Sequence, residues 1–111
     1  MANANKAKGD RFERSCAAYL TEHTKFRVMR RFGAGAQEDR GDLEGLPGMV
    51  IQACDWKNKS DALRQKPPEA DTQAERSHPD MIGVTAIKLV GGDIRFVFTQ
   101  EAFVRFVNRY L

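Results

Sequence analysis

Two aspartates and a lysine, Asp42, Asp55 and Lys57, have the residue types and the order that phosphodiester hydrolysis needs. This reaction is extremely slow in water, so an enzyme uses a divalent cation to polarise the phosphate and to make hydroxide near neutral pH. Such a cation is hard and prefers oxygen ligands. Asp55 and Lys57 face the same side if both lie on one strand. In this interpretation Asp42 and Asp55 hold the metal, while Lys57 orients or deprotonates the attacking water.

The acid-x-lysine pattern is weak by itself in a chain that is 30% charged, so its context matters. Among the lysines, Lys57 alone has an acidic residue two places before it. Asp42 begins a short strand candidate, a Pro-Gly turn follows, and Asp55 ends an apolar segment. Glu13, on a predicted helix, supplies a further oxygen to the metal, directly or through water. A plain surface position explains Glu13 equally well.

A group of basic residues flanks these candidates, and it fits phosphate contacts that position a duplex without reading its sequence. Its members are Arg27, Arg30, Arg31, Arg40, Lys57 and Lys59. A solvated basic face is the alternative explanation. The net charge of +3 does not decide between them, because many proteins without a polyanionic partner have the same value.

The elements that must position these side chains follow from apolar periodicity and turn residues. We expect a helix over 8–23, a strand over 26–30, a flexible loop at 33–36, and a hairpin with arms at 42–45 and 49–56 around a turn at 46–48. After it we expect helical segments at 60–65 and 69–77 separated by Pro67 and Pro68, strands at 81–90 and 94–98, and a last helix capped by Thr99. The arm at 49–56 is nearly continuous in apolar character, as suits a central strand covered on both faces.

These elements predict an α/β (α+β) chain with a mixed central sheet of about five strands flanked by helices. Its 111 residues fit a single domain over 1–111. Cys16 and Cys54 lack zinc-ligand spacing. The beginning of the chain has no apolar signal stretch, and no run is long enough to span a membrane, so we expect a cytoplasmic protein.

The order of these motifs resembles the PD-(D/E)xK nuclease superfamily and, within it, small Holliday junction resolvases of the archaeal and phage type. The likeness covers nearly the whole chain and rests on Glu13, the segments 40–48 and 50–58, Gln73-Ala74-Glu75 and Gly83-Val84. It implies a restriction-endonuclease-like core and Mg²⁺- or Mn²⁺-dependent cleavage of four-way or other branched DNA by a homodimer. It also implies no small-molecule cofactor and, for a phage-encoded protein, the host cytoplasm. Glu13 matches the acid of the first helix, and Gln73, a DNA-binding candidate, matches a polar position on the helix after the catalytic strand. A plain surface glutamine is the alternative interpretation of Gln73.

The sequence departs from this family at two points. Gly41 stands where the common pattern has Pro before the first Asp. Phage relatives often place the acid-x-lysine closer to that Asp, where this chain has Gln52 and Cys54. Either Asp55 and Lys57 have taken over, or Gln52 is a weaker oxygen ligand and Cys54 replaces the lysine, which would leave an impaired site. The two pairs lie on opposite strand faces, so one strand without a bulge cannot use both.

Three functions are therefore compatible with the sequence. The first is a structure-selective endonuclease for Holliday junctions or related branched DNA. The second is another nuclease of the same superfamily, of the repair, nicking or restriction-like type. The third is a DNA-binding protein on the same scaffold that no longer cuts.

Overall fold

A computed structural model describes residues 4–31 and 42–111 of the chain, with side chains from Lys8 onward in the first helix. These residues form helices and strands in the order α1 (Ala4–His23), β1 (Met29–Arg30), β2 (Leu43–Glu44), β3 (Met49–Cys54), α2 (Lys59–Ser77), β4 (Ile82–Lys88), β5 (Ile94–Val97) and α3 (Gln100–Tyr110). The expected α+β class, with a mixed five-stranded sheet and flanking helices, is confirmed.

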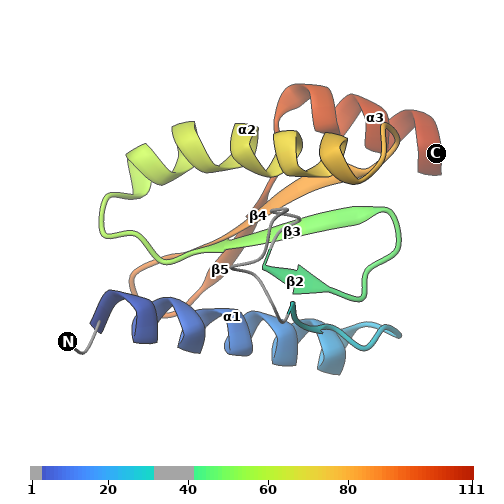
Figure 1. Ribbon diagram of the computed structural model, residues 1–111. Helices are drawn as coiled ribbons and strands as arrows, with labels where there is room; N and C mark the ends of the chain where they lie inside the picture. Colours follow the sequence, from blue (N-terminus) through green and yellow to red (C-terminus); the bar gives the residue numbers. More distant parts are fainter. Residues whose placement is uncertain (1–3, 32–41) are drawn as a thin grey trace.

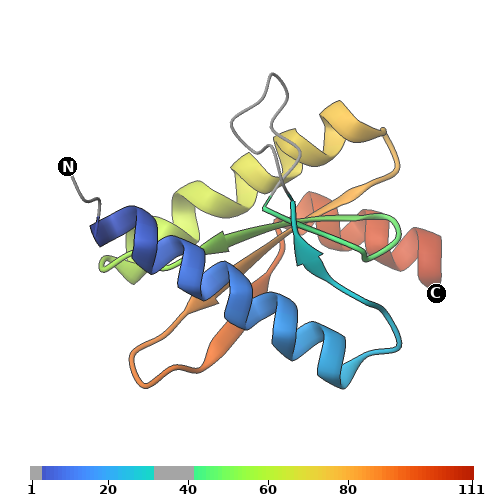
Figure 2. The same ribbon diagram turned by 60° about the horizontal axis from the view of Figure 1, so that its bottom comes forward.

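The strands are arranged spatially in the same order as in the sequence, β1-β2-β3-β4-β5. β3 and β4 are parallel, and the other neighbouring strands pair antiparallel. Helix α2 connects the two parallel strands, as parallel pairing requires a crossover. Figure 1 shows α1 on one side of the sheet and α2 and α3 on the other, and Figure 2 shows α1 crossing the sheet face. β3 is thus the covered central strand that its apolar sequence predicts.

The sheet face that meets α1 carries the larger apolar cluster. Phe12 and Cys16 of α1 are buried there with Leu43, Ile51 and Val84 from three adjacent strands. Ile51 and Val84 are partners in the parallel register, so they lie on the same face. Because side chains alternate along a strand, every second residue of β3 from Ile51 onward is directed toward α1.

The opposite face packs closely against α2 through small residues. A Cβ added at Gly83 would lie 2.4 Å from the backbone carbon of Ala70 and 2.4 Å from the backbone nitrogen of Asp71. Further along the same face, Cys54 and Ile87 pack with Ala62 of α2. The missing side chain at Gly83 therefore allows helix and sheet to approach within backbone contact.

The expected break at the two prolines is wrong, because α2 is one continuous helix that contains both Pro67 and Pro68. Each proline lacks the N–H that would bond the preceding turn. The helix nevertheless continues, since Pro67, Ala70 and Ala74 are all buried against the sheet. Tertiary packing here outweighs the local penalty, as it commonly does for helical segments in proteins.

The strand expected over 26–30 is shorter, and regular pairing covers Met29–Arg30 alone. The hydroxyl of Thr21 explains the difference. It accepts a hydrogen bond from the Val28 N–H at 2.9 Å and donates to the Val28 carbonyl at 3.0 Å. A side chain of α1 thus satisfies the backbone groups that a longer strand would have paired.

The turn expected at 46–48 and the helix cap expected at Thr99 are both confirmed. Gly48 has a φ of 77° in the turn before β3, a conformation that favours glycine. Thr99 is the N-cap of α3, and its hydroxyl accepts a hydrogen bond from the Ala102 N–H at 2.9 Å. α3 buries Ala102 completely but leaves much of its apolar stripe exposed.

Candidate active site

Asp42 lies immediately before β2, where hydrogen bonds of its backbone and of its carboxylate hold it. Its N–H donates to the Ile51 carbonyl at 2.8 Å, and its carbonyl accepts from the Arg31 N–H at 2.9 Å. Its carboxylate Oδ2 accepts from the Ala53 N–H at 2.9 Å. The carboxylate oxygen thereby replaces a main-chain acceptor in the pairing of β2 with β3. This hydrogen bond fixes the carboxylate beside Ala53 of β3.

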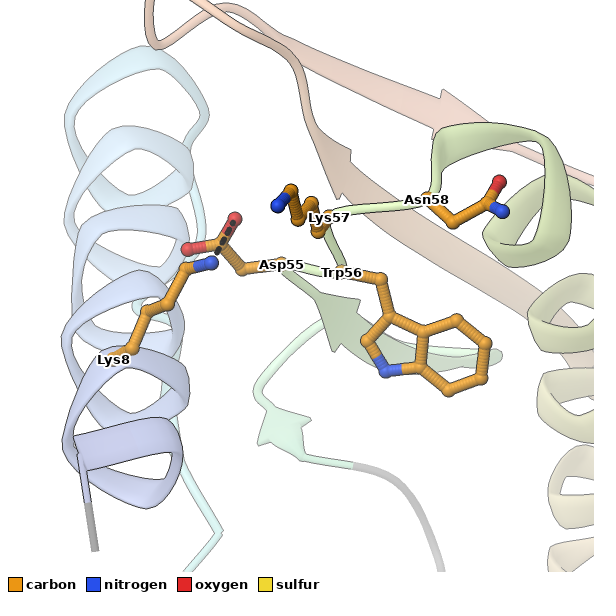
Figure 3. Close-up of a pocket in the computed structure, with 5 residues that line it drawn as sticks. All are labelled: Lys8, Asp55, Trp56, Lys57 and Asn58. Atoms are coloured by element: carbon orange, nitrogen blue, oxygen red, sulfur yellow. Dashed lines mark ion pairs between the residues drawn. The ribbon is translucent and has the colours of Figure 1, made fainter.

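Asp55 and Lys57 follow directly after β3 and point to the same side. Figure 3 shows Asp55 directed toward α1, Lys57 on that side as well, and Trp56 directed away toward α2. A pocket of about 470 Å³ lies here, lined by Lys8, Asp55, Trp56, Lys57 and Asn58. The arm expected over 49–56 ends at Cys54, so Asp55 and Lys57 share a side as loop residues after β3 and not as neighbours on one strand.

Three lysines from three different elements surround the Asp55 carboxylate. The Nζ atoms of Lys8 and Lys59 lie 3.8 and 3.7 Å from Oδ1, and the Nζ of Lys88 lies 3.8 Å from Oδ2. The Asp55 side chain is 6% exposed, so the lysines cover a nearly buried carboxylate.

Sequence reasoning missed Lys8 and Lys88, although each left a weak signal. Lys88 ends β4 just as Asp55 follows β3, and the parallel register pairs Cys54 with Ile87 immediately before them. Lys8 precedes the buried Phe12 by four residues, which places both on one helix face. Neither signal is usable until the strand pairing and the helix face are known.

Gln52 and Cys54, the alternative register, lie on the sheet face opposite to that of Asp55. Gln52 is opposite Thr85 in the parallel register and is 7% exposed, and Cys54 is 2% exposed in the cluster with Ala62. The side-chain oxygen of Gln52 is buried without a hydrogen-bond partner in the described part of the chain. These two side chains are therefore directed into the α2 interface and not into the pocket.

Glu13 and Arg30, both candidates from the sequence, contact each other. The Nε of Arg30 donates to Glu13 Oε1 at 3.0 Å, and its Nη2 donates to Asp10 Oδ1 at 3.0 Å. Glu13 thus has the α1 position expected for it, but its carboxylate holds an arginine in this structure. A metal ligand at Glu13 would require Arg30 to move.

The charges of Glu13 and Asp42 act on the same buried thiol. Burial, together with smaller contributions from the negative charges of Glu13 and Asp42, raises the pKa of Cys16 to about 12. Burial also raises the pKa of Cys54, with smaller opposing effects from nearby positive groups. Both carboxylates therefore influence the α1 side of the sheet, the side that Asp55 faces.

The remaining DNA-binding candidates are dispersed. Arg31 forms an ion pair with Glu44 at 3.7 Å, and Lys59 belongs to the group around Asp55. Gln73 is 4% exposed within α2, about four turns from Lys59. Arg40, Gly41 and the loop at 33–36 lie outside the described residues.

The carboxylate oxygens at this site are the type of ligand that a hard cation prefers. Within residues 4–31 and 42–111, no three side chains of His, Cys, Asp or Glu gather closely enough to hold a metal. Mg²⁺, however, is commonly held by one or two carboxylates together with waters and substrate phosphates. Asp55 Oδ2 is buried with no hydrogen-bond partner among the described residues, and the Lys88 Nζ, 3.8 Å away, would have to move aside for such an ion. Asp42 and Asp55 are the residues that would hold it; Asp55 lines the pocket, whereas Asp42 is outside that lining and has one carboxylate oxygen on the Ala53 N–H.

No protein-family model, curated protein or solved structure matches the chain. Among the helices of the described residues, none is both long and apolar enough to cross a membrane.

Proposed function

We propose that this chain is a Mg²⁺- or Mn²⁺-dependent DNA endonuclease with a restriction-endonuclease-like core, and that it cuts Holliday junctions or related branched DNA. The observation that carries the proposal is the placement of Asp55 and Lys57 on the α1 side of the β3 end, beside the strand that holds Asp42. A basic pocket lies at the same place. Carboxylates and a lysine next to a phosphate-attracting pocket are the groups that phosphodiester hydrolysis requires.

Each group has a distinct task in this proposal. Asp42 and Asp55 hold the divalent cation, which when bound supplies Lewis acidity to the phosphate. Lys57, as an ammonium group, orients the attacking water and offsets the negative charge that develops as the oxygen attacks phosphorus, while the proton of the water passes through solvent to the leaving sugar oxygen. The bond from phosphorus to the leaving sugar oxygen then breaks. Gln52 and Cys54 take no part, because both are buried against α2.

Cleavage assays with synthetic DNA test the proposal. The purified protein is incubated with a four-way junction or with linear duplex, in Mg²⁺ or Mn²⁺. We expect symmetric junction cuts that Asp42→Asn abolishes, while the exposed Asp80→Asn, at the turn before β4, serves as a charge-matched control. Preferential cutting of linear or nicked duplex would favour a repair, nicking or restriction-like nuclease instead.

The register of the site has its own test. Asp55→Asn is expected to abolish cleavage, whereas Gln52→Ala is expected to retain it when circular dichroism shows a folded protein. Loss of cleavage in folded Gln52→Ala together with full cleavage in Asp55→Asn would reverse the assignment in favour of Gln52 and Cys54.

The lysines around Asp55 favour a second candidate function, a DNA-binding protein that does not cut. A carboxylate that holds three ammonium groups at 3.7 to 3.8 Å is less available to a cation. Junction binding with no cleavage in either metal would overturn the nuclease proposal and support this alternative.

We further propose that the working form is a homodimer in the cytoplasm. Two related strands of a junction need two sites, which twofold symmetry supplies. The outer side of α3 offers an apolar surface for the contact, with Phe103 53%, Val104 55% and Tyr110 45% exposed. Light scattering after size exclusion should give twice the chain mass, and Phe103→Glu should give the monomer. A monomeric wild-type protein would contradict the dimer.

A further inference from the structure

The lysines around Asp55 carry more positive charge than that carboxylate can balance. Lys8, Lys59 and Lys88 come from α1, α2 and β4, and their side chains are 45%, 26% and 43% exposed. Three ammonium groups face one carboxylate, and the ammonium group of Lys57 lines the adjacent pocket together with Lys8 and Asp55. The local excess of positive charge is therefore built from three segments of the chain that are distant in sequence, at Lys8, at 57–59 and at Lys88.

The separations from Asp55 leave the ammonium donors available. Each Nζ lies 3.7 to 3.8 Å from a carboxylate oxygen, beyond the usual hydrogen-bond distance of about 3.2 Å. An ammonium group has three donors and no acceptor. Asp55 thus attracts the lysines to one place without satisfying their hydrogen bonds, and a ligand with several acceptor oxygens would satisfy them better.

The start of α2 adds to this attraction. Asn58 is the N-cap of the helix, lines the pocket, and accepts a hydrogen bond from the Asp61 N–H at 3.0 Å. The backbone N–H groups of the first helical residues, which begin at Lys59, give this end a partial positive charge. The pocket therefore combines side-chain ammonium groups with a helix end of the same sign.

We infer that Lys8, Lys59 and Lys88 form a phosphate-binding site whose ligand is a phosphate of a nucleic-acid backbone. Lysine binds phosphate as a point charge, and three lysines from different directions can share the two non-bridging oxygens of a backbone phosphate. Asp55 draws the three side chains together before the ligand arrives and reduces the affinity by its own charge. The inference rests on the proposed function in taking DNA as the source of the phosphate.

The site is tested by DNA binding without cleavage. Fluorescence anisotropy measures the affinity of a labelled four-way junction in EDTA at several salt concentrations, for Lys8→Gln, Lys59→Gln and Lys88→Gln. Each change should weaken binding and reduce the slope of log K against log salt by about one. Lys25→Gln is the matched control, because Lys25 is exposed beyond the far end of α1, and it should leave the slope unchanged.

Asp55→Asn separates a phosphate site from a purely structural group of ion pairs. If the lysines bind phosphate, removing the carboxylate charge should raise junction affinity in EDTA. If Asp55→Asn lowers the affinity, or if the three lysine variants have the slope of Lys25→Gln and differ only in melting temperature, the inference is overturned. Cleavage is not measured, so a protein that binds in this way but never cuts would refute the nuclease proposal and leave this site intact.

A further experiment distinguishes free inorganic phosphate from the DNA backbone as the ligand of this site. Inorganic phosphate is titrated at constant ionic strength and followed by NMR in the wild type and in Lys59→Gln. Shifts around Asn58 that disappear in Lys59→Gln support a site that also accepts free phosphate. No shifts, with the lysine effects on the junction retained, support a site specific for the DNA backbone.

Discussion

β3 and β4 run side by side through two very different environments. Near Gly83 the backbone of α2 lies so close that a single Cβ would meet it at 2.4 Å. A few residues further along, Asp55 lines an open pocket, and Lys88 at the end of β4 lies 3.8 Å from its carboxylate. The dry, closely packed part holds the two strands in place. Strands held in this way can carry several like charges at their ends.

The first prediction breaks the charged region alone. Lys57→Met should reduce cleavage by about 10²- to 10³-fold, because it removes the positive charge proposed to orient the water and stabilise the transition state, while leaving packing unchanged at an exposed position. Single-turnover cleavage of a junction measures the effect, with Lys25→Met as the matched control. Equal rates for the two variants would remove Lys57 from the mechanism.

The second prediction breaks the packed region alone. Gly83→Ala should lower the free energy of unfolding by about 1–3 kcal/mol, because the new methyl group must displace the backbone of α2. Gly9→Ala is the control, since a Cβ there meets nothing within 4 Å and α1 gains a better helix former. Urea unfolding should show opposite signs for the two changes. Similar stability of both variants would contradict the close approach at Gly83.

The third prediction concerns the helix that follows β5. Thr99→Ala should lower the free energy of unfolding by about 1 kcal/mol, because α3 loses its N-cap acceptor. It also removes the 3.3 Å hydrogen bond from the Thr99 hydroxyl to Asp71 Oδ2 on α2. Thr72→Ala, at an exposed position of α2, should have little effect in the same urea titration. A loss as large in Thr72→Ala would argue against the cap.

The fourth prediction concerns the pH dependence of stability that the buried thiol of Cys16 causes. Cys16 has a pKa of about 12 in the folded protein and 9.0 as its ordinary value. The unfolded chain therefore ionises first, so this contribution to stability is complete below pH 9 and is lost as the pH rises toward 12. Unfolding at pH 10 should show a loss of about 1 kcal/mol that is absent in Cys16→Ala. An identical pH profile in that variant would refute the assignment to Cys16.

Local patterns were sufficient for most of the fold. The helical spacing that starts at Phe12, the turn at Gly48 and the cap at Thr99 each act over a few residues, and each element formed where its pattern predicted. Local reasoning failed at Pro67 and at Val28, where burial of α2 and the Thr21 hydroxyl supplied what the local sequence lacked. In both cases the stabilising contact comes from another element of the structure, and the spacing of apolar residues along one segment does not reveal it.

The sequence by itself determined the candidates of the site, Asp42, Asp55 and Lys57, and the fact that Asp55 and Gln52 must face opposite sides. Only the tertiary structure decided which side faces α1, because this depends on how β3 pairs with β2 and β4. It also decided that Lys8 and Lys88, distant in sequence, meet at Asp55. Side chains far apart in the chain converge only when strand pairing and helix packing place them together, and a single sequence does not record those distances.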